Sequence, residues 1–308
     1  MARNVNSKKR SEDNVSSVRR AKNGWIITLF MSIVSIAWLS PIFIVLINSF
    51  KRKAYIFKYP FSLSTKSLSD GWDKYVAGMK KMVCGLLNYS NGIKKTNFWE
   101  SFGYSAFITV GSVLLIILCC SMCAWYITRV HTKGTKIIYL LCLFSMIVPF
   151  QMVMFTLSKF ANILHLYTPL GIIVVYLGFG AGLAVFMFTG FVKGISIEIE
   201  EAAMIDGCNP LETFFLVVFP ILKPTTITVA ILEAMWVWND FLLPSLVLNI
   251  NKYKTIPIAI QYLKQSHGQI DWGAMMAVLV LAITPIVIFY LIGQKYIIEG
   301  VLAGAVKG

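Results

Sequence analysis

The chain has 308 residues, of which 57% are hydrophobic and only 14% are charged, and its formal net charge is +14. Soluble domains ordinarily keep their apolar share near or below half, so this composition excludes a soluble globular protein and indicates a polytopic membrane protein. The basic residues are scattered over the polar segments, without a Lys/Arg-aromatic nucleic-acid module. The positive charge therefore favours anionic lipid headgroups, and no nucleic acid, as its partner.

Apolar runs divide the rest of the chain. Residues 1–24 are polar and basic and are predicted to form a disordered tail. Six later runs are each long enough to span a bilayer as a helix. We predict spans at about 25–50, 98–128, 137–157, 169–192, 222–248 and 274–298.

The predicted fold class is all-α, a polytopic membrane protein with six transmembrane helices. Residues 51–97 then form an external loop whose shape the sequence leaves open, and 98–298 form a five-helix core. Residues 299–308 are predicted to be a C-terminal tail. With both termini inside, the Lys and Arg residues divide equally between inner and outer segments, so the positive-inside rule does not fix the orientation.

No residue is predicted to be catalytic. The chain has no G-x-x-x-x-G-K-[ST] phosphate loop, so we expect no ATP hydrolysis of its own. It also has no H-E-x-x-H metal pair. Most of the six cysteines fall inside apolar runs and are expected to be small apolar packing residues, and Cys84 has no external partner for a structural disulfide. We therefore expect no metal and no cofactor in this chain.

A polar and acidic segment, 196–224, interrupts the apolar runs. Ser196 is a plausible N-cap for a helix through Asp206, with glutamates in its early turns where they favour the helix dipole. Gly207 is predicted to end that helix, because glycine takes a left-handed backbone conformation without a Cβ penalty.

A second short helix is predicted to follow immediately. Asn209 can cap it, Pro210 suits the first helical position, and Glu212 completes a capping-box pattern. In the first helix, Ile199, Ala202 and Ala203, flanked by Ile205, form a small apolar stripe on which another backbone could pack closely.

These residues carry a resemblance. Glu201-Ala202-Ala203, then Gly207, then Phe219-Pro220 resembles the EAA loop of permease subunits in bacterial binding-protein-dependent ABC importers. Val217 and Phe219 depart from the isoleucine and leucine of that pattern but stay apolar. The likeness covers nearly the whole chain beyond residue 98.

Two further stretches narrow the resemblance. The run Trp238-Asn239-Asp240-Phe241, followed by Pro244, and the tail 299–308 are similar to the carbohydrate-transporting branch, in particular its maltose-permease-like second subunit. The implied function is a transmembrane permease subunit of an ATP-driven oligosaccharide importer, which forms half of the translocation pathway by alternating access.

The resemblance also implies partners and docking residues. The partners would be a homologous permease in a heterodimer, a dimer of ATP-binding subunits that carries ATP and Mg, and an extracellular sugar-binding protein. The implied ATPase-docking residues are Glu201, Ala202, Ala203, Asp206, Gly207 and Pro220. Because this loop would meet a cytoplasmic ATPase, both termini would be cytoplasmic in a bacterial plasma membrane.

The fifth predicted span contains a polar cluster. A carboxylate near the bilayer midplane must face protein or water, so Glu233 is expected to point into the bundle. Carboxylates and amides could bind sugar hydroxyls and an indole could cover a sugar ring; structural hydrogen bonds and an interfacial aromatic belt are the alternatives. The candidate substrate-pathway residues are Glu233, Trp236, Asn239, Asp240 and, in the third span beside Pro149, Gln151.

Two other classes of protein compete with this interpretation. An ion-coupled secondary transporter could use Glu233 and Asp240 as proton sites, and an intramembrane enzyme is a third possibility. Neither needs the acidic, glycine-broken segment 196–224, so that segment distinguishes the importer from its rivals.

Overall fold

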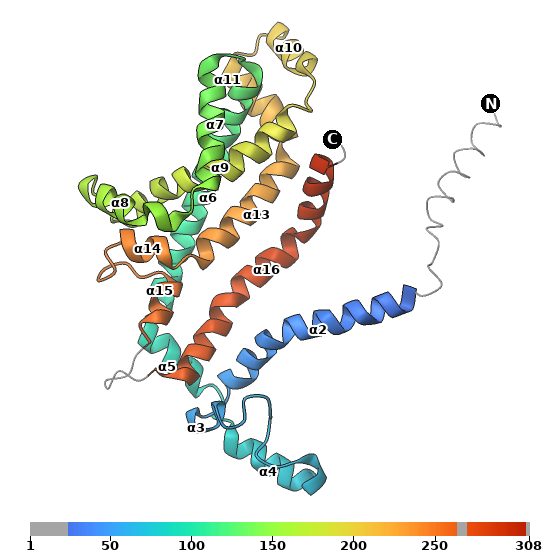
Figure 1. Cartoon of the computed structure of the whole chain (residues 1–308), viewed down its shortest axis with the longest axis vertical. Coiled ribbons are helices and arrows are strands. Elements are labelled where there is room, and N and C mark those ends of the chain that lie inside the picture. The colour runs from blue at the N-terminus through green and yellow to red at the C-terminus, as the bar shows by residue number, and fades with distance from the viewer. Residues whose placement is uncertain (1–23, 264–269, 306–308) are drawn as a thin grey trace, which may run out of the picture.

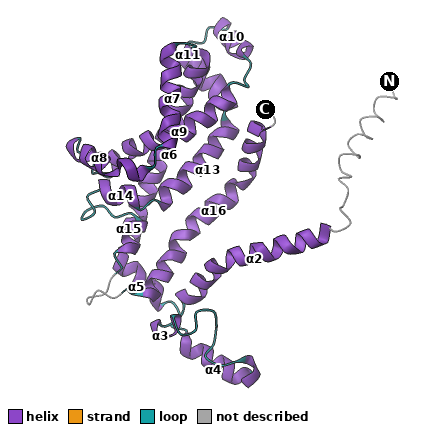
Figure 2. Ribbon diagram, in the orientation of Figure 1, coloured by secondary structure: helices purple, strands orange, loops and turns teal. Residues whose placement is uncertain are grey.

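The computed structural model describes residues 24–263 and 270–305, and all the regular elements in these ranges are helices. Helices α6, α9, α13 and α16 run roughly along the length of the molecule, α2 extends away from them to one side, and α10 lies at one end with α3 and α4 at the other (Figures 1 and 2). Four helices are continuous and apolar enough to cross a membrane: α2 (Gly24–Ser49), α6 (Phe98–Arg129), α9 (Pro169–Val192) and α16 (Trp272–Ala305).

The third predicted span is bent. Helix α7 (Lys133–Ile147) meets α8 (Phe150–Ile163) at 109°. Pro149 explains the break, because it lacks an N–H and pushes the preceding residue out of helical geometry; Val148 has a ψ of 116°. Residues 137–157 are thus one apolar run but not one straight helix.

The fifth predicted span, 222–248, is also interrupted, because α13 (Lys223–Asn239) ends before Asp240 and α14 (Leu242–Val247) restarts beyond it. The segment that precedes this span, 210–221, meets α13 at 77°. Asp240 has an extended backbone, and its Oδ1 accepts hydrogen bonds from the N–H groups of Leu242 and Leu243 at 2.9 and 3.3 Å. With each bent pair counted as one span, the described chain has six, as predicted.

The predicted external loop 51–97 is itself helical. It contains α3 (Lys53–Ile56), a 3₁₀ turn η1 (Leu68–Asp70), α4 (Trp72–Met82) and α5 (Leu87–Thr96). Lys51 anchors it: the buried Nζ donates to Asn48 Oδ1, to the Tyr59 carbonyl and to the Pro60 carbonyl at 2.8–3.1 Å. These three acceptors satisfy the donors of an ammonium that is removed from water.

The two chain ends differ in what the structure describes. Helix α16 continues to Ala305, so residues 299–305 of the predicted C-terminal tail are helical. The predicted basic tail, except for Gly24 at the start of α2, and residues 306–308 lie outside the described residues.

The core is the contact of α6 with α9, on which α7 and α13 also pack. Glycines on α9 permit the close approach. A Cβ on Gly182 would lie 2.5–2.7 Å from Met146, Ser145 and the Cys142 carbonyl of α7. Helix packing in a membrane depends on such small residues, because apolar burial gives no advantage over lipid.

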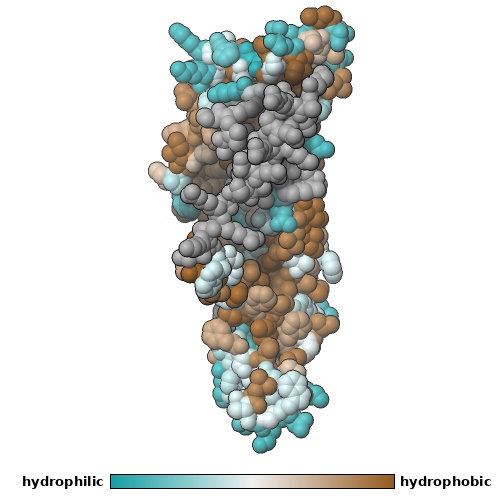
Figure 3. Space-filling model, turned by 90° about the vertical axis from the view of Figure 1, so that its right-hand side faces the viewer, coloured by the Kyte–Doolittle hydropathy of each residue, from teal (hydrophilic) through white to brown (hydrophobic). Residues whose placement is uncertain are grey.

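The surface matches a membrane-spanning bundle. Hydrophilic side chains gather at the two ends of the long axis, and hydrophobic side chains predominate in the lower half of the face between them (Figure 3). Helix α2 packs against α16 and exposes most of its large apolar side chains, which is the surface expected of a helix that meets lipid or another apolar chain.

We predict that Gly182→Ala destabilises the protein, because the added methyl group must displace α7 backbone; overpacking of this kind typically costs about 1–3 kcal/mol. Gly178→Ala on the same helix is the matched control, since its Cβ meets nothing within 4 Å. Thermal unfolding of the detergent-purified protein measures both. Equal midpoints for the two variants would contradict the packing described here.

Candidate functional site

Segment 196–224 forms two short helical parts joined at Gly207. Helix α10 (Ile197–Ile205) begins at Ser196, whose Oγ accepts a hydrogen bond from Glu198 N–H at 3.3 Å. At its end Gly207 has a φ of +96°, its N–H donates to the Met204 carbonyl, and the Cys208 N–H donates to the Ala203 carbonyl. This is a Schellman-type helix end, and the predicted cap and stop are both confirmed.

The second part runs as α11 (Pro210–Glu212), η2 (Thr213–Val218) and α12 (Phe219–Ile221). Its predicted capping box is present: Glu212 N–H donates to Asn209 Oδ1 at 3.0 Å, and Asn209 N–H donates to Glu212 Oε2 at 2.8 Å. The middle part η2 is π-helical. Pro220 is compatible with this wider turn, because in an α-helix its ring would clash with the carbonyl four residues earlier.

The outer surface of α10 carries exposed apolar side chains among its acidic ones. Ile205 is 85% exposed, and Ile199, Ala202 and Met204 are exposed beside it. Ala203 is different: it is only 9% exposed and faces its own chain, so its methyl group offers little surface to a partner protein. The helical spacing of the apolar stripe did not show which of its residues would face η2. The other candidate docking residues, Glu201, Asp206, Gly207 and Pro220, are all exposed.

Sequence reasoning missed the group that holds α10 in place. Glu200 accepts hydrogen bonds from Arg129 Nε and Nη2 at 3.0 and 2.6 Å and from Trp125 Nε1 at 2.9 Å. The Glu200 side chain is 3% exposed and that of Arg129 is 18% exposed. No local pattern pairs these residues, which lie 71 positions apart; the available signals were an acidic residue preceding the Glu201 triplet and a basic residue ending an apolar span.

The midplane residue Glu233 lies inside the bundle, as expected. It is 2% exposed, and a Cβ on Gly180 of α9 would lie 3.0 Å from its Oε2. That oxygen has no hydrogen-bond partner in the described structure. Glu233 therefore lies between packed helices of this chain and does not line an open cavity within it.

Two of the candidate pathway residues meet at a third side chain that the sequence did not single out. Trp236 packs edge-on against Tyr176 of α9 with ring centroids 5.4 Å apart, and Tyr176 Oη donates to Asp240 Oδ2 at 3.0 Å. Tyr176 is fully buried, whereas Trp236 is 41% exposed. Because Asp240 also caps α14, its carboxylate already has partners within the chain.

The remaining residues of the polar cluster have separate surroundings. Trp238 Nε1 donates to the Ala282 carbonyl of α16 at 3.1 Å, so a structural hydrogen bond between helices accounts for this indole. Asn239 is exposed and donates to the Met235 carbonyl in its own helix. Gln151 is exposed on α8, beyond the bend at Pro149, so the structure does not bring it into contact with Trp236.

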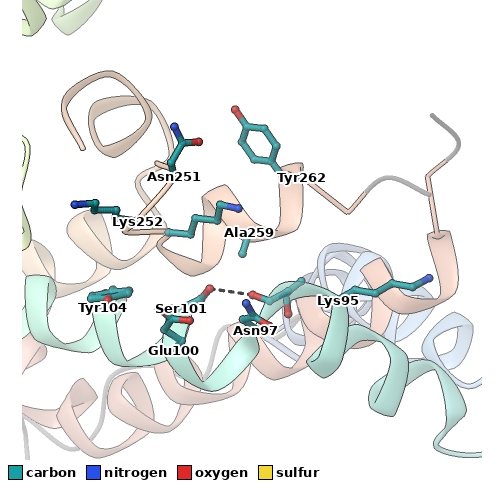
Figure 4. A pocket seen from close by; sticks show the side chains of 11 residues that line it. Lys95, Asn97, Glu100, Ser101, Tyr104, Asn251, Lys252, Ala259 and Tyr262 are labelled. Carbon is teal, nitrogen blue, oxygen red and sulfur yellow. Dashed lines mark hydrogen bonds between the residues drawn. The ribbon is translucent and has the colours of Figure 1, made fainter. Parts of the chain in front are cut away.

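A polar cavity of about 140 Å³ lies at the end of α6 away from α10. Its walls come from α6, from the end of α5, and from the segment that leads into and includes α15 (Ile256–Gln261). Figure 4 shows Lys252 and Asn251 on one side, Tyr262 above, and Glu100 and Tyr104 on the α6 floor. Lys95 at its edge forms an ion pair with Asp271.

An all-α chain with four to six apolar spans and a polar helical loop at one end has the architecture of a membrane-embedded transport subunit. Residues 116–302 match the family described as "Binding-protein-dependent transport system inner membrane component". The chain belongs to this family, and it is a multi-pass membrane protein.

Relatives cover almost the entire chain. It is 38% identical over 283 residues to the "Probable starch degradation products transport system permease protein AmyC" of Thermoanaerobacterium thermosulfurigenes, covering 92% of this chain and 97% of that protein. It is 31% identical to the "Melibiose/raffinose/stachyose import permease protein MelC" of Bacillus subtilis, covering 94% and 99%.

A solved structure shows the same fold. It is titled "Crystal structure of a bacterial ABC transporter involved in the import of the acidic polysaccharide alginate", and the match has a TM-score of 0.69 over 91% of this chain and 98% of that chain. At 19% identity this match supports the fold alone.

We predict that Gly207→Val loosens the end of α10. The glycine has open space around it but a positive φ, so the cost is backbone strain of about 1–2 kcal/mol. Hydrogen exchange of the amides in 203–208 should become faster, because the strained turn weakens the Schellman bonds. Gly190→Val, in open space with ordinary helical geometry, is the control; unchanged exchange in the Gly207 variant would contradict the strain.

Proposed function

We propose that this chain is the permease subunit of a bacterial ATP-driven importer of carbohydrates, in particular of oligosaccharides. Its relatives are named for transport of starch degradation products and of melibiose, raffinose and stachyose. The observation that carries the proposal is α10, a helix with exposed apolar side chains that Arg129 and Trp125 hold at one end of the bundle through Glu200. An ion-coupled transporter has no need of such a surface.

The proposed assembly has two permeases and two ATPases. A homologous permease covers the apolar faces that this chain leaves exposed, and ATP and Mg bind to the partner ATPases, with no cofactor in this chain. The ATPases dock on Glu201, Ala202, Ile205 and neighbouring residues of segment 196–224. This places α10 and both termini in the cytoplasm and the polar cavity beside Glu100 outside, where a sugar-binding protein delivers substrate.

The proposed mechanism is alternating access. Closure of the ATPases on ATP displaces the two docking segments, and the permeases then exchange an outward-facing for an inward-facing arrangement. The half-exposed indole of Trp236 offers a flat apolar face to a sugar ring, and Asn239 offers amide donors and acceptors beside it. Gln151 is proposed as a further part of the path, completed by the partner permease, and Glu233 and Asp240 as buried residues that position the helices lining it.

The docking surface is tested by Ile205→Asp. If Ile205 is buried by the ATPase, an unpaired carboxylate there costs several kcal/mol, and the ATPase should be lost from affinity-purified membranes. Phe61→Asp, an equally conspicuous exposed apolar residue in the external segment, is the matched control and should retain the ATPase. Normal ATPase recovery with Ile205→Asp would refute docking at α10.

The substrate class is tested in proteoliposomes that contain the complete complex and the binding protein. We expect oligosaccharides from a panel of sugars to stimulate ATP hydrolysis and uptake. Trp236→Ala should lower uptake about tenfold, the effect of losing about 1.4 kcal/mol of sugar contact, with the ATPase still bound.

Trp25→Ala in α2 controls for the loss of an exposed indole. Unchanged uptake in the Trp236 variant would move the sugar site to the partner permease. No stimulation by any carbohydrate would overturn the substrate class.

A further inference from the structure

Two adjacent glutamates of α10 face different surroundings. Glu201 is exposed, whereas the side chain of Glu200 is 3% exposed and lies against the end of α6. The carboxylate of Glu200 is thus unavailable to a partner protein. It is committed to contacts within this chain.

Those contacts converge from a single turn of α6. Arg129 donates to both oxygens of Glu200, and its Nη2 also donates to the Ile195 carbonyl at 3.0 Å, just before the α10 cap. Trp125, four residues earlier and therefore on the same helix face, donates its indole N–H to Glu200 Oε2. Arg129 and Trp125 therefore fix both α10 and the residue before its cap, Ile195, to α6.

The same turn also contacts the second docking part. The indole ring of Trp125 packs against Phe214 of η2, with centroids 5.4 Å apart. Phe214 is fully buried, and α10 itself packs on η2. One side chain, Trp125, therefore joins α10, η2 and α6, with its N–H bonded to the first and its ring tilted against the second.

Helix α6 can carry a displacement far from this end. Its 32 residues extend over about 48 Å at 1.5 Å per residue. Near its other end, Glu100, Ser101 and Tyr104 line the polar cavity. Between the two ends it forms the core contact with α9.

We propose that Trp125, Arg129 and Glu200 form a rigid joint that makes the docking helix α10 and the core helix α6 move as one body, so that ATPase motion is converted into rearrangement of the translocation path. This inference rests on the proposed function. The three side chains act as positioning residues, because none of them touches substrate or nucleotide.

The chemistry of the joint suits transmission of force. A guanidinium holds a carboxylate in a fixed planar orientation through parallel hydrogen bonds, which a flexible ammonium cannot do. Burial protects the pair from screening by salt. A displacement of α10 is therefore resisted by several directional bonds and not by a solvated surface ion pair.

The first test compares transport with ATP consumption in the reconstituted complex. Arg129→Ala should keep the ATPase bound and hydrolysing ATP, but sugar uptake per ATP hydrolysed should fall about tenfold, a typical size for coupling between sites. Glu200→Gln should reduce the same ratio less, because its amide keeps one acceptor oxygen. The double variant should be no worse than Arg129→Ala, since residues that act as a unit are not additive.

One control and one milder variant of the joint separate an effect on coupling from an effect on folding. Lys136→Ala removes an exposed positive charge at the same end of the molecule and should leave the ratio unchanged. Trp125→Phe keeps a ring against Phe214 and removes only the N–H donor, so it should lower the ratio even where Arg129→Ala fails to accumulate in membranes. An unchanged uptake-to-ATP ratio in these joint variants would overturn the proposal.

The second test measures rigidity directly. Spin labels at exposed positions Tyr126 on α6 and Glu198 on α10 should keep one distance distribution in nucleotide-free and ATP-bound complexes. In Arg129→Ala that distribution should broaden or shift on ATP binding. A wild-type distance that changes with nucleotide would overturn the joint but leave the importer function intact, whereas a wild-type chain that binds no ATPase would refute the function itself.

Discussion

The contact of α6 with α9 is the constraint on which the rest of the structure depends. Inside a membrane, apolar side chains gain little by leaving lipid, so helices associate where their backbones can approach closely. Gly180 and Gly182 of α9 provide that approach, one towards Ile116 of α6 and the other towards α7. The bent segments and the helices of segment 196–224 are then built around a pair of helices whose separation is fixed.

Polar groups within this bundle satisfy one another where the helices break. Asp240 ends α13, caps α14 and accepts a hydrogen bond from Tyr176, so one carboxylate compensates for two backbone N–H groups freed by the break. Such compensation is required in a low-dielectric interior, where an unsatisfied N–H or C=O costs several kcal/mol. These hydrogen bonds also give a structural reason for Asp240 in the Trp238-Asn239-Asp240 sequence. That reason does not require Asp240 to contact a sugar.

The two sides of α10 have different surroundings for the same physical reason. Its exposed surface, around Ile205, is apolar and suited to another protein, while its inner side is held by a buried ion pair and an indole. A short isolated helix is marginal by itself, so α10 depends on these tertiary contacts for its position. Ala203 belongs to the inner side, although the EAA pattern groups it with the exposed Glu201 and Ala202.

The sequence alone determined the apolar runs, the caps at Ser196 and Asn209 and the helix end at Gly207, because hydropathy and capping depend on residues within one or two turns. Tertiary structure decided which side chains face one another. Glu200 meets Arg129 across 71 positions and Tyr176 meets Asp240 across 64, and no local pattern encodes either pair. The bend at Pro149 is intermediate: proline predicts a break, but the angle of 109° depends on what α7 and α8 pack against.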